Sequence, residues 1–287
     1  MTVDGSARHA PAERGIEGAA KPTGGAARRI WGLLYRHLAL YRRSWPRLVE
    51  LAYWPILQMA IWGFVSEYLV RASGWAAAAS GVLIGAVLLW EVCLRSQMGF
   101  AISFLEEVWS RNLGNLFVSP IRPGELVAAL IAMSALRMLA GVLPAIGLAA
   151  LLYAFDILSI GPALPLFFAN LMAMGWAVAL GVTAMVLRYG AGAEALAWSV
   201  LFGLAPLSAV FYPVSVLPDW LRPVSLAIPA THVFEGMRAG LLEGRFAAGH
   251  LGAAVALNAL WLAAAAALFA AVFRTARRKG LLLNVGE

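Results

Sequence analysis

The chain has 287 residues, of which 62% are hydrophobic and only 13% are charged. This composition excludes an ordinary soluble globular domain and predicts an all-α polytopic protein of the lipid bilayer. The net charge of +7 comes without the aromatic and basic pattern of a nucleic-acid-binding surface, and a single cysteine excludes a disulfide framework within one chain.

The N-terminal region is predicted to contain a disordered tail followed by an amphipathic helix. Residues 1–27 are rich in Gly, Ala and Arg and lack the apolar core of a signal peptide. Residues 30–47 carry apolar side chains at helical intervals: Leu34, Leu38, Tyr41 and Trp45. This pattern predicts an interfacial helix on the cytoplasmic leaflet, and a basic flank before the first membrane span is the alternative.

Six stretches are long and apolar enough to cross a hydrocarbon core of about 30 Å. They are residues 49–70, 76–104, 126–154, 161–187, 195–215 and 251–273. The fifth stretch runs into Tyr212-Pro213 without a clean polar end. Nine Lys and Arg residues precede the first stretch and four follow the last, so both termini are expected in the cytoplasm. An even number of spans, such as these six, also brings both termini to the same side of the membrane.

Three charged side chains fall within the predicted spans: Glu91, Arg95 and Arg137. Glu91 and Arg95 are one helical turn apart, so we expect an ion pair; a role in handling substrate or protons is the alternative. Arg137 has no local acidic partner. It could pair with Glu91 across helices, extend toward the cytoplasmic side or bind an anionic substrate.

A polar segment, residues 106–126, interrupts the apolar pattern between the second and third spans. Apolar side chains at helical spacing oppose a polar face, and prolines end the predicted helix. The helix is expected in the cytoplasm, on the membrane surface or against a partner protein. Glu106 and Glu107 could pair with an arginine of that partner or form a solvated face. Trp109 is favoured as part of a protein contact over an anchor at the membrane interface.

The longest outer loop, residues 211–250, has prolines separated by apolar residues and then a helix-like run. It is predicted to dip into the outer leaflet or to lie on it. His232, Glu235 and Arg238 share one helical face. A hydrogen-bonded group that fixes this helix is favoured over a metal site.

Motifs for catalysis are missing from the sequence. It has no G-x-x-x-x-G-K-[ST] phosphate-binding loop and no H-E-x-x-H zinc motif, and Ser80 lacks the first glycine of a G-x-S element. The chain is therefore predicted not to be an enzyme.

Two motifs in their topological places resemble the permease subunit of type-2 ABC exporters over about residues 28–280. The first, E-x-x-W-S-R-x-L-x-x-L-x-V-S-P-I-R-P-x-E-L, lies between spans two and three, and the second, L-P-x-W-L-x-x-x-x-x-x-I-P-x-T-H-x-x-E-x-x-R, precedes the last span. The outer loops are short and carry no appended carbohydrate-binding domain, so the resemblance does not extend to a specific expectation of long-polysaccharide export.

The resemblance implies a function for each motif. Residues 106–120 would be the coupling helix that docks on an ATPase, with Glu106, Glu107, Trp109, Arg111, Leu113, Leu116 and Pro120. Residues 214–245 would form re-entrant outer helices, with Pro218, Trp220, Pro229, His232, Glu235 and Arg238. Residues 30–47 would match the family's amphipathic helix, and residues 281–287 are expected to be a cytoplasmic tail.

The resemblance also implies partners: a second copy of the chain and two copies of a separate ATPase, which would bind ATP and Mg. The predicted function is the permease of an ATP-driven exporter in the cell inner membrane, for an amphipathic or hydrophobic substrate such as a lipid, glycolipid or drug-like molecule. An ion-coupled carrier or channel using Glu91, Arg95 and Arg137 is the alternative. A membrane scaffold without transport is a third possibility.

Overall fold

The computed structural model describes residues 25–279 except residues 43, 74–76, 115–118 and 120. Every regular element in these residues is a helix, which confirms the predicted all-α fold class. The α-helices are α1 (Ala26–Arg42), α2 (Trp45–Ser73), α3 (Ala77–Trp109), α5 (Pro123–Tyr153), α6 (Leu164–Tyr189), α7 (Ala195–Leu207), α8 (Arg222–Leu226), α9 (Pro229–Glu243) and α10 (Ala248–Lys279). The short 3-10 helices are η1 (Ile157–Ile160), η2 (Gly190–Ala193) and η3 (Val214–Val216).

Among the described residues, five helices are long and apolar enough to cross a membrane: α2, α3, α5, α6 and α10. The fifth predicted span, residues 195–215, differs from the structure, because its helix α7 has only 13 residues. Such a helix is about 20 Å long and cannot span a hydrocarbon core of about 30 Å by itself. The prediction of six long membrane helices was therefore wrong at this position.

Prolines and one arginine explain why α7 is short. Pro206 in the last turn of α7 and Pro213 beyond it lack the N–H group that a helix hydrogen bond uses, and Ala209, with a positive φ of 51°, leaves the helical conformation. Arg238 of α9 donates hydrogen bonds to backbone carbonyl oxygens just after α7, those of Ala209, Val210 and Tyr212. The guanidinium thus satisfies carbonyl groups that would otherwise lack partners in an apolar environment.

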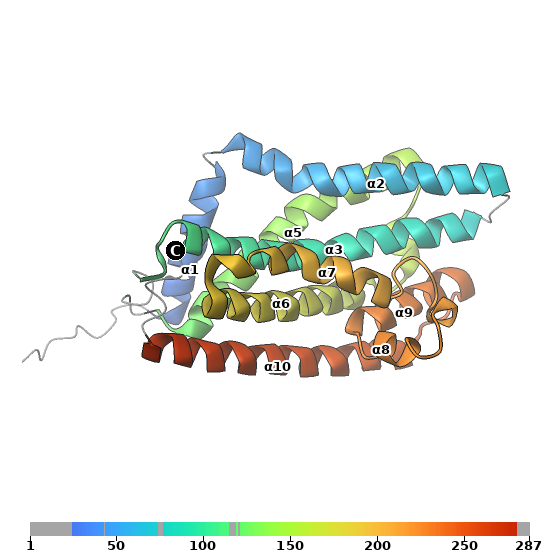
Figure 1. The fold of residues 1–287 in the computed structure, drawn as a ribbon. Coiled ribbons are helices and arrows are strands. Elements are labelled where there is room, and N and C mark those ends of the chain that lie inside the picture. The colour runs from blue at the N-terminus through green and yellow to red at the C-terminus, as the bar shows by residue number, and fades with distance from the viewer. Residues whose placement is uncertain (1–24, 43, 74–76, 115–118, 120, 280–287) are drawn as a thin grey trace, which may run out of the picture.

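The long helices run alternately along the bundle, and α7 with the chain after it takes the place of one traverse (Figure 1). Helix α1 and the C-terminal end of α10 lie at the same end of the bundle, here called the α1 end. Helices α8 and α9 lie at the opposite end, here called the α9 end. The even number of traverses brings the two ends of the described chain to one side.

The core of the bundle is built around α3, which contacts both α5 and α6. Helix α10 packs on α6 and α2 packs on α5, so that α2 and α10 form opposite edges in Figure 1. Large side chains from several helices are completely or almost completely buried in this core, among them Phe100, Phe104, Met174 and Phe234.

Helix α1 lies across the α1 end, over the ends of the long helices (Figure 1). It covers Ala26–Arg42 rather than residues 30–47, and Trp45 begins α2. The buried face of α1 consists of Leu33, Leu34, His37 and Tyr41. Leu34 and Tyr41 of the amphipathic pattern are thus buried against the bundle, whereas Trp45 belongs to the next helix and is 74% exposed.

Gly175 allows α3 and α6 to approach closely. A Cβ atom on Gly175 would lie 2.7 Å from the backbone oxygen of Cys93 and 3.0 Å from the backbone nitrogen of Gln97. Further along α6, a Cβ atom on Gly181 would meet no atom within 4 Å. Small residues at helix contacts are typical of membrane bundles, where backbones pack directly against each other.

We expect Gly175→Ala to lower the free energy of unfolding by about 1–3 kcal/mol, because the added methyl group forces α3 and α6 apart. Gly181→Ala is the matched control and should be neutral or stabilising by roughly 0.5–1 kcal/mol, since alanine favours the helix. Thermal unfolding of the purified variants in detergent measures both effects. Equal melting temperatures for the two variants would contradict this account of the α3–α6 contact.

Candidate functional site

The first residues of the predicted coupling segment, 106–109, form the end of α3, and its residues 115–118 and 120 lie outside the described part of the chain. Helix α3 continues to Trp109 and is followed by a turn at Ser110 and Arg111. Arg111 has a positive φ of 52°, and the backbone N–H of Asn112 donates to the carbonyl of Glu107. This left-handed turn closes the C-terminus of α3.

Glu107 is almost completely buried beneath α1. Its carboxylate accepts a hydrogen bond from Arg36 at 2.5 Å and one from Asn112 at 2.8 Å. The imidazole Nε2 of His37 lies 3.4 Å from the same carboxylate. Only 1% of the Glu107 side chain is exposed, so its charge depends on these partners rather than on water.

Glu106 turns toward α2 and α5. Its carboxylate accepts a hydrogen bond from Arg137 at 3.0 Å and lies 3.5 Å from both Arg47 and the Nδ1 atom of His37. The guanidinium of Arg137 also lies over the ring of Tyr41, 4.5 Å from its centroid. Burial raises the pKa of Tyr41, so the phenol stays neutral beside the arginine.

These contacts form one charged cluster that joins four helices. Its members are Arg36 and His37 of α1, Arg47 of α2, Glu106 and Glu107 of α3, and Arg137 of α5. Taking a carboxylate out of water is unfavourable unless a cation and hydrogen bonds replace the water. Each glutamate has both kinds of partner here, so the cluster holds α1 and α2 onto the end of α3.

Two expectations about charged residues are corrected by this cluster. Glu106 and Glu107 both have cationic partners within the chain, so neither needs an arginine of a partner protein to balance its charge. Arg137 pairs with Glu106 and not with Glu91. The sequence could not reveal the true partners, because Arg36 and Arg47 are far from Glu106 and Glu107 along the chain.

Glu91 and Arg95 form the expected ion pair within α3, with Arg95 Nε 3.0 Å from Glu91 Oε2. The side chain of Glu91 is buried, whereas that of Arg95 is partly accessible. Arg95 lines a cavity of about 270 Å³ beside the charged cluster, together with Arg47, Glu106, Trp109 and Arg137. The structure thus brings Arg95 and Arg137 to one cavity, while Glu91 does not line it.

Other predicted coupling residues divide into exposed and buried ones. Trp109 is 51% exposed, and its indole N–H donates to Glu194 of the α6–α7 connection at 3.1 Å. Arg111 is exposed as well, whereas Leu113 is buried in the core. Leu116 and Pro120 lie outside the described residues. Trp109 and Arg111 therefore form the accessible part of the segment, and Glu194 is a contact that the sequence analysis missed.

The predicted outer group lies at the α9 end. Pro229 begins α9, while Pro218 and Trp220 are exposed in the chain before α8. His232 lies 2.9 Å from the carbonyl oxygen of Leu226 through Nε2. Its Nδ1 atom lies 3.3 Å from that of His250 on α10, a contact that the sequence analysis did not anticipate.

Glu235 and Arg238 fix the chain that follows α7. Glu235 lies 3.2 Å from Arg238 and accepts a hydrogen bond from the backbone N–H of Val214 at 2.8 Å. Burial lowers the pKa of Arg238, although a guanidinium keeps its charge at neutral pH. The contacts match a hydrogen-bonded group that holds α9, and the described residues contain no group of three or more potential metal ligands.

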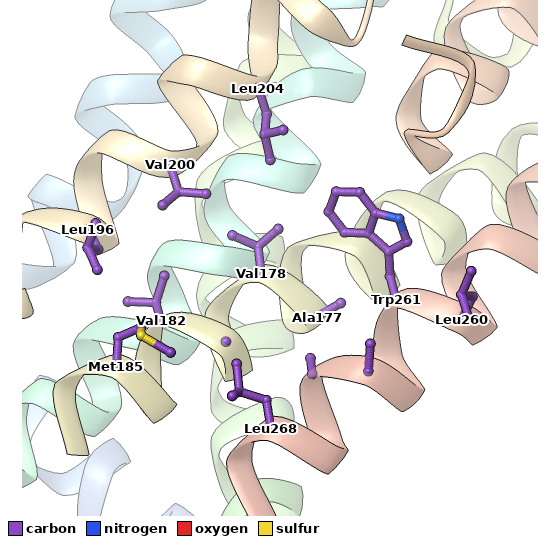
Figure 2. A pocket seen from close by; sticks show the side chains of 13 residues that line it. Ala177, Val178, Val182, Met185, Leu196, Val200, Leu204, Leu260, Trp261 and Leu268 are labelled. Carbon is purple, nitrogen blue, oxygen red and sulfur yellow. The ribbon is translucent and has the colours of Figure 1, made fainter. Parts of the chain in front are cut away.

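An apolar groove of about 770 Å³ lies between α6, α7 and α10 (Figure 2). Figure 2 shows Val178 and Val182 of α6, Val200 of α7, and Trp261 and Leu268 of α10 around this space. None of its lining side chains is charged. The groove can therefore hold hydrocarbon, from a lipid or from an apolar part of another ligand.

We expect Arg137→Gln to lower the free energy of unfolding by about 3 kcal/mol, because it removes a buried cation that is the closest partner of the partly buried Glu106 carboxylate. Arg245→Gln is the control: it breaks an exposed pair with Glu243 and should change stability by less than about 1 kcal/mol. Thermal unfolding in detergent compares the two. The double variant Arg137→Gln with Glu106→Gln should lose less free energy of unfolding than the two single variants lose together. Strictly additive losses would contradict the pairing.

Comparisons with known proteins place the chain in a family. A search of curated proteins finds no similar sequence. The model of the family described as "ABC-2 type transporter" matches residues 28–242, from α1 through almost all of α9. This match covers well over half of the chain and includes the charged cluster and the outer group. The chain therefore belongs to the ABC-2 type transporter family, as a multi-pass membrane protein and the permease component of an ABC transporter.

Proposed function

We propose that this chain is the permease of an ATP-driven exporter and that it works as a pair of copies with two separate ATPase subunits. ATP and Mg would bind to those subunits, and the permease itself would be non-catalytic. The observation that carries the proposal is the end of α3, where an exposed Trp109 and Arg111 directly follow the charged cluster. An exposed tryptophan and arginine are the residue types that most often dominate a protein contact.

The charged cluster explains how a docked ATPase would move the membrane helices. A force on Trp109 acts on the last turn of α3, which salt bridges join to α1, α2 and α5. The hydrogen bond from Trp109 to Glu194 adds the start of α7. The helices at the α1 end would therefore shift together as a rigid group when the ATPase subunits close.

The substrate class follows from the two kinds of space in the bundle. The cavity beside the charged cluster offers three arginines and two glutamates to a polar group, while the groove of Figure 2 offers only hydrocarbon contacts. An amphipathic molecule, such as a lipid, a glycolipid or a drug-like compound, suits both. We propose export from the cytoplasm or inner leaflet as the direction.

The cytoplasmic side is assigned to the α1 end by its basic residues. The described part of α1 contains several arginines, and Arg274, Arg277 and Arg278 end α10 at the same side. Positive residues remain on the cytoplasmic side of membrane proteins. With this orientation Trp109 would lie in the cytoplasm, as ATPase docking requires, and the cell inner membrane is the proposed location.

An ion-coupled carrier receives no support from the three charged residues predicted for it. Glu91 is buried and paired with Arg95, and Arg137 is paired with Glu106. The three residues thus divide between two ion pairs instead of forming one ion-binding site.

We expect Trp109→Ala to weaken association with the ATPase by about 30-fold or more, as for a residue at the centre of a protein contact. The measurement is affinity purification of the tagged chain from its native membrane, with mass spectrometry of the soluble ATPase that co-purifies. Trp220→Ala is the matched control, since this tryptophan is 74% exposed but lies at the α9 end.

Glu194→Ala separates docking from an internal role, because it removes only the hydrogen bond that Trp109 makes within the chain. It should keep the ATPase bound. Equal loss in Glu194→Ala and Trp109→Ala would show that Trp109 acts through its own chain, and an undiminished ATPase in Trp109→Ala would refute the docking proposal.

The edge helix α2 is the proposed contact between the two copies. Three of its exposed side chains, Trp54, Ile61 and Tyr68, are spaced by seven residues and therefore share one face.

In a background with Cys93→Ser, which removes the single cysteine, Ile61→Cys should give a cross-linked dimer with a bifunctional thiol reagent in native membranes. Leu260→Cys on α10, which is 64% exposed, should not. Cross-linking only at residue 260 would move the interface to α10, and none at residue 61 would indicate that lipid covers α2.

A further inference from the structure

Two grooves flank the contact between α6 and α10, and they differ in charge. The groove of Figure 2 lies on the α7 side and has no charged lining residue. The second groove, on the α5 side, has a volume of about 480 Å³ and ends at two arginines, Arg274 and Arg277. Both have apolar walls, so the arginines set the second groove apart.

The apolar part of the second groove comes from three helices. Its lining residues are Pro123, Gly124 and Val127 of α5, Leu180 of α6, and Ala266, Phe269, Ala270 and Phe273 of α10. A Cβ atom on Gly124 would meet no atom within 4 Å, so the wall at this position is open. A volume of this size is within the range of small-ligand sites in proteins.

The two arginines are arranged to receive one anion. They are three residues apart on α10 and therefore project from the same helix face. Both side chains are exposed, and the Nε atom of Arg274 donates to the carbonyl of Ala270 in its own helix. No carboxylate lines the groove, and no salt bridge within the described residues uses either arginine. The nearby Glu125 at the start of α5 is already held by Arg29 at 2.6 Å.

The position of the arginines matches the headgroup level of a lipid leaflet. They lie near the end of a helix that is long enough to cross the membrane, at the α1 end, with the apolar wall extending back along the bundle. Positive charge at a helix end follows from membrane topology alone. Here the two arginines also stand at the end of an apolar groove, which topology does not require. This arrangement fits a molecule with a phosphate at one end and hydrocarbon at the other.

We propose that the groove between α5, α6 and α10 binds an anionic phospholipid of the surrounding bilayer. Its phosphate lies on Arg274 and Arg277, and one acyl chain lies against Val127, Leu180 and Phe269. Because α10 is an edge helix, a lipid in this groove adds contacts between α10 and α5 that the protein alone does not make. The proposal requires neither the ATPase nor transport, so its test can fail separately from that of the proposed function.

The test is a lipid titration of the purified full-length chain in detergent, followed by native mass spectrometry and by the melting temperature. The probes are phosphatidylglycerol, which is anionic, and phosphatidylcholine, which is zwitterionic. The wild type should retain phosphatidylglycerol in preference to phosphatidylcholine, and its melting temperature should be higher with phosphatidylglycerol. The double variant Arg274→Gln with Arg277→Gln should bind phosphatidylglycerol about 30-fold more weakly and lose the preference.

Two single variants test the geometry. Arg278→Gln removes a neighbouring exposed charge that does not line the groove, so binding should stay close to that of the wild type. Ala270→Phe fills the groove and should reduce binding of phosphatidylglycerol although both arginines remain. If Arg278→Gln weakens phosphatidylglycerol binding as much as the double variant does, the loss would come from overall charge rather than from the groove. Full binding by Ala270→Phe would refute the proposed position of the acyl chain. A wild type without preference between the lipids would overturn the proposal.

Discussion

The burial of two neighbouring carboxylates at the end of α3 is the constraint on which the arrangement of the α1 end depends. Glu106 and Glu107 are adjacent in sequence, so on a helix they project in different directions. Glu107 is shielded from water and Glu106 is only partly accessible, so each is balanced by cations from other helices. Glu107 draws in α1 through Arg36, and Glu106 draws in α2 and α5 through Arg47 and Arg137.

A similar requirement acts at the α9 end, where it involves backbone groups instead of carboxylates. The chain after α7 leaves the helix in an apolar part of the molecule and exposes carbonyl groups that need donors. Arg238 supplies them and is itself oriented by Glu235. Buried ionic contacts thus lie at both ends of the bundle; between them, apart from the Glu91–Arg95 pair within α3, mainly apolar packing and small residues hold the helices together.

This distribution suits a permease. Rigid ionic contacts at the α1 end connect the proposed docking segment to several helices at once, so a displacement there would not be absorbed locally. The edge helices α2 and α10 have fewer neighbours within the chain and face either lipid or another copy. The apolar grooves beside α10 are consistent with lipid contact along that edge, while the exposed aromatic face of α2 is consistent with a protein contact.

The sequence by itself determined the all-α membrane class, the amphipathic character of the first helix, the Glu91–Arg95 pair and the family. Each of these depends on residues close together along the chain or on composition, and the helical period relates such residues directly. Only the tertiary structure decided that Glu106 and Glu107 face inward, that Arg137 pairs with Glu106, that α7 stops after 13 residues and that Arg274 and Arg277 end a groove. These features join residues on different helices, and helix contacts depend on how whole faces pack, which periodicity along one segment does not specify.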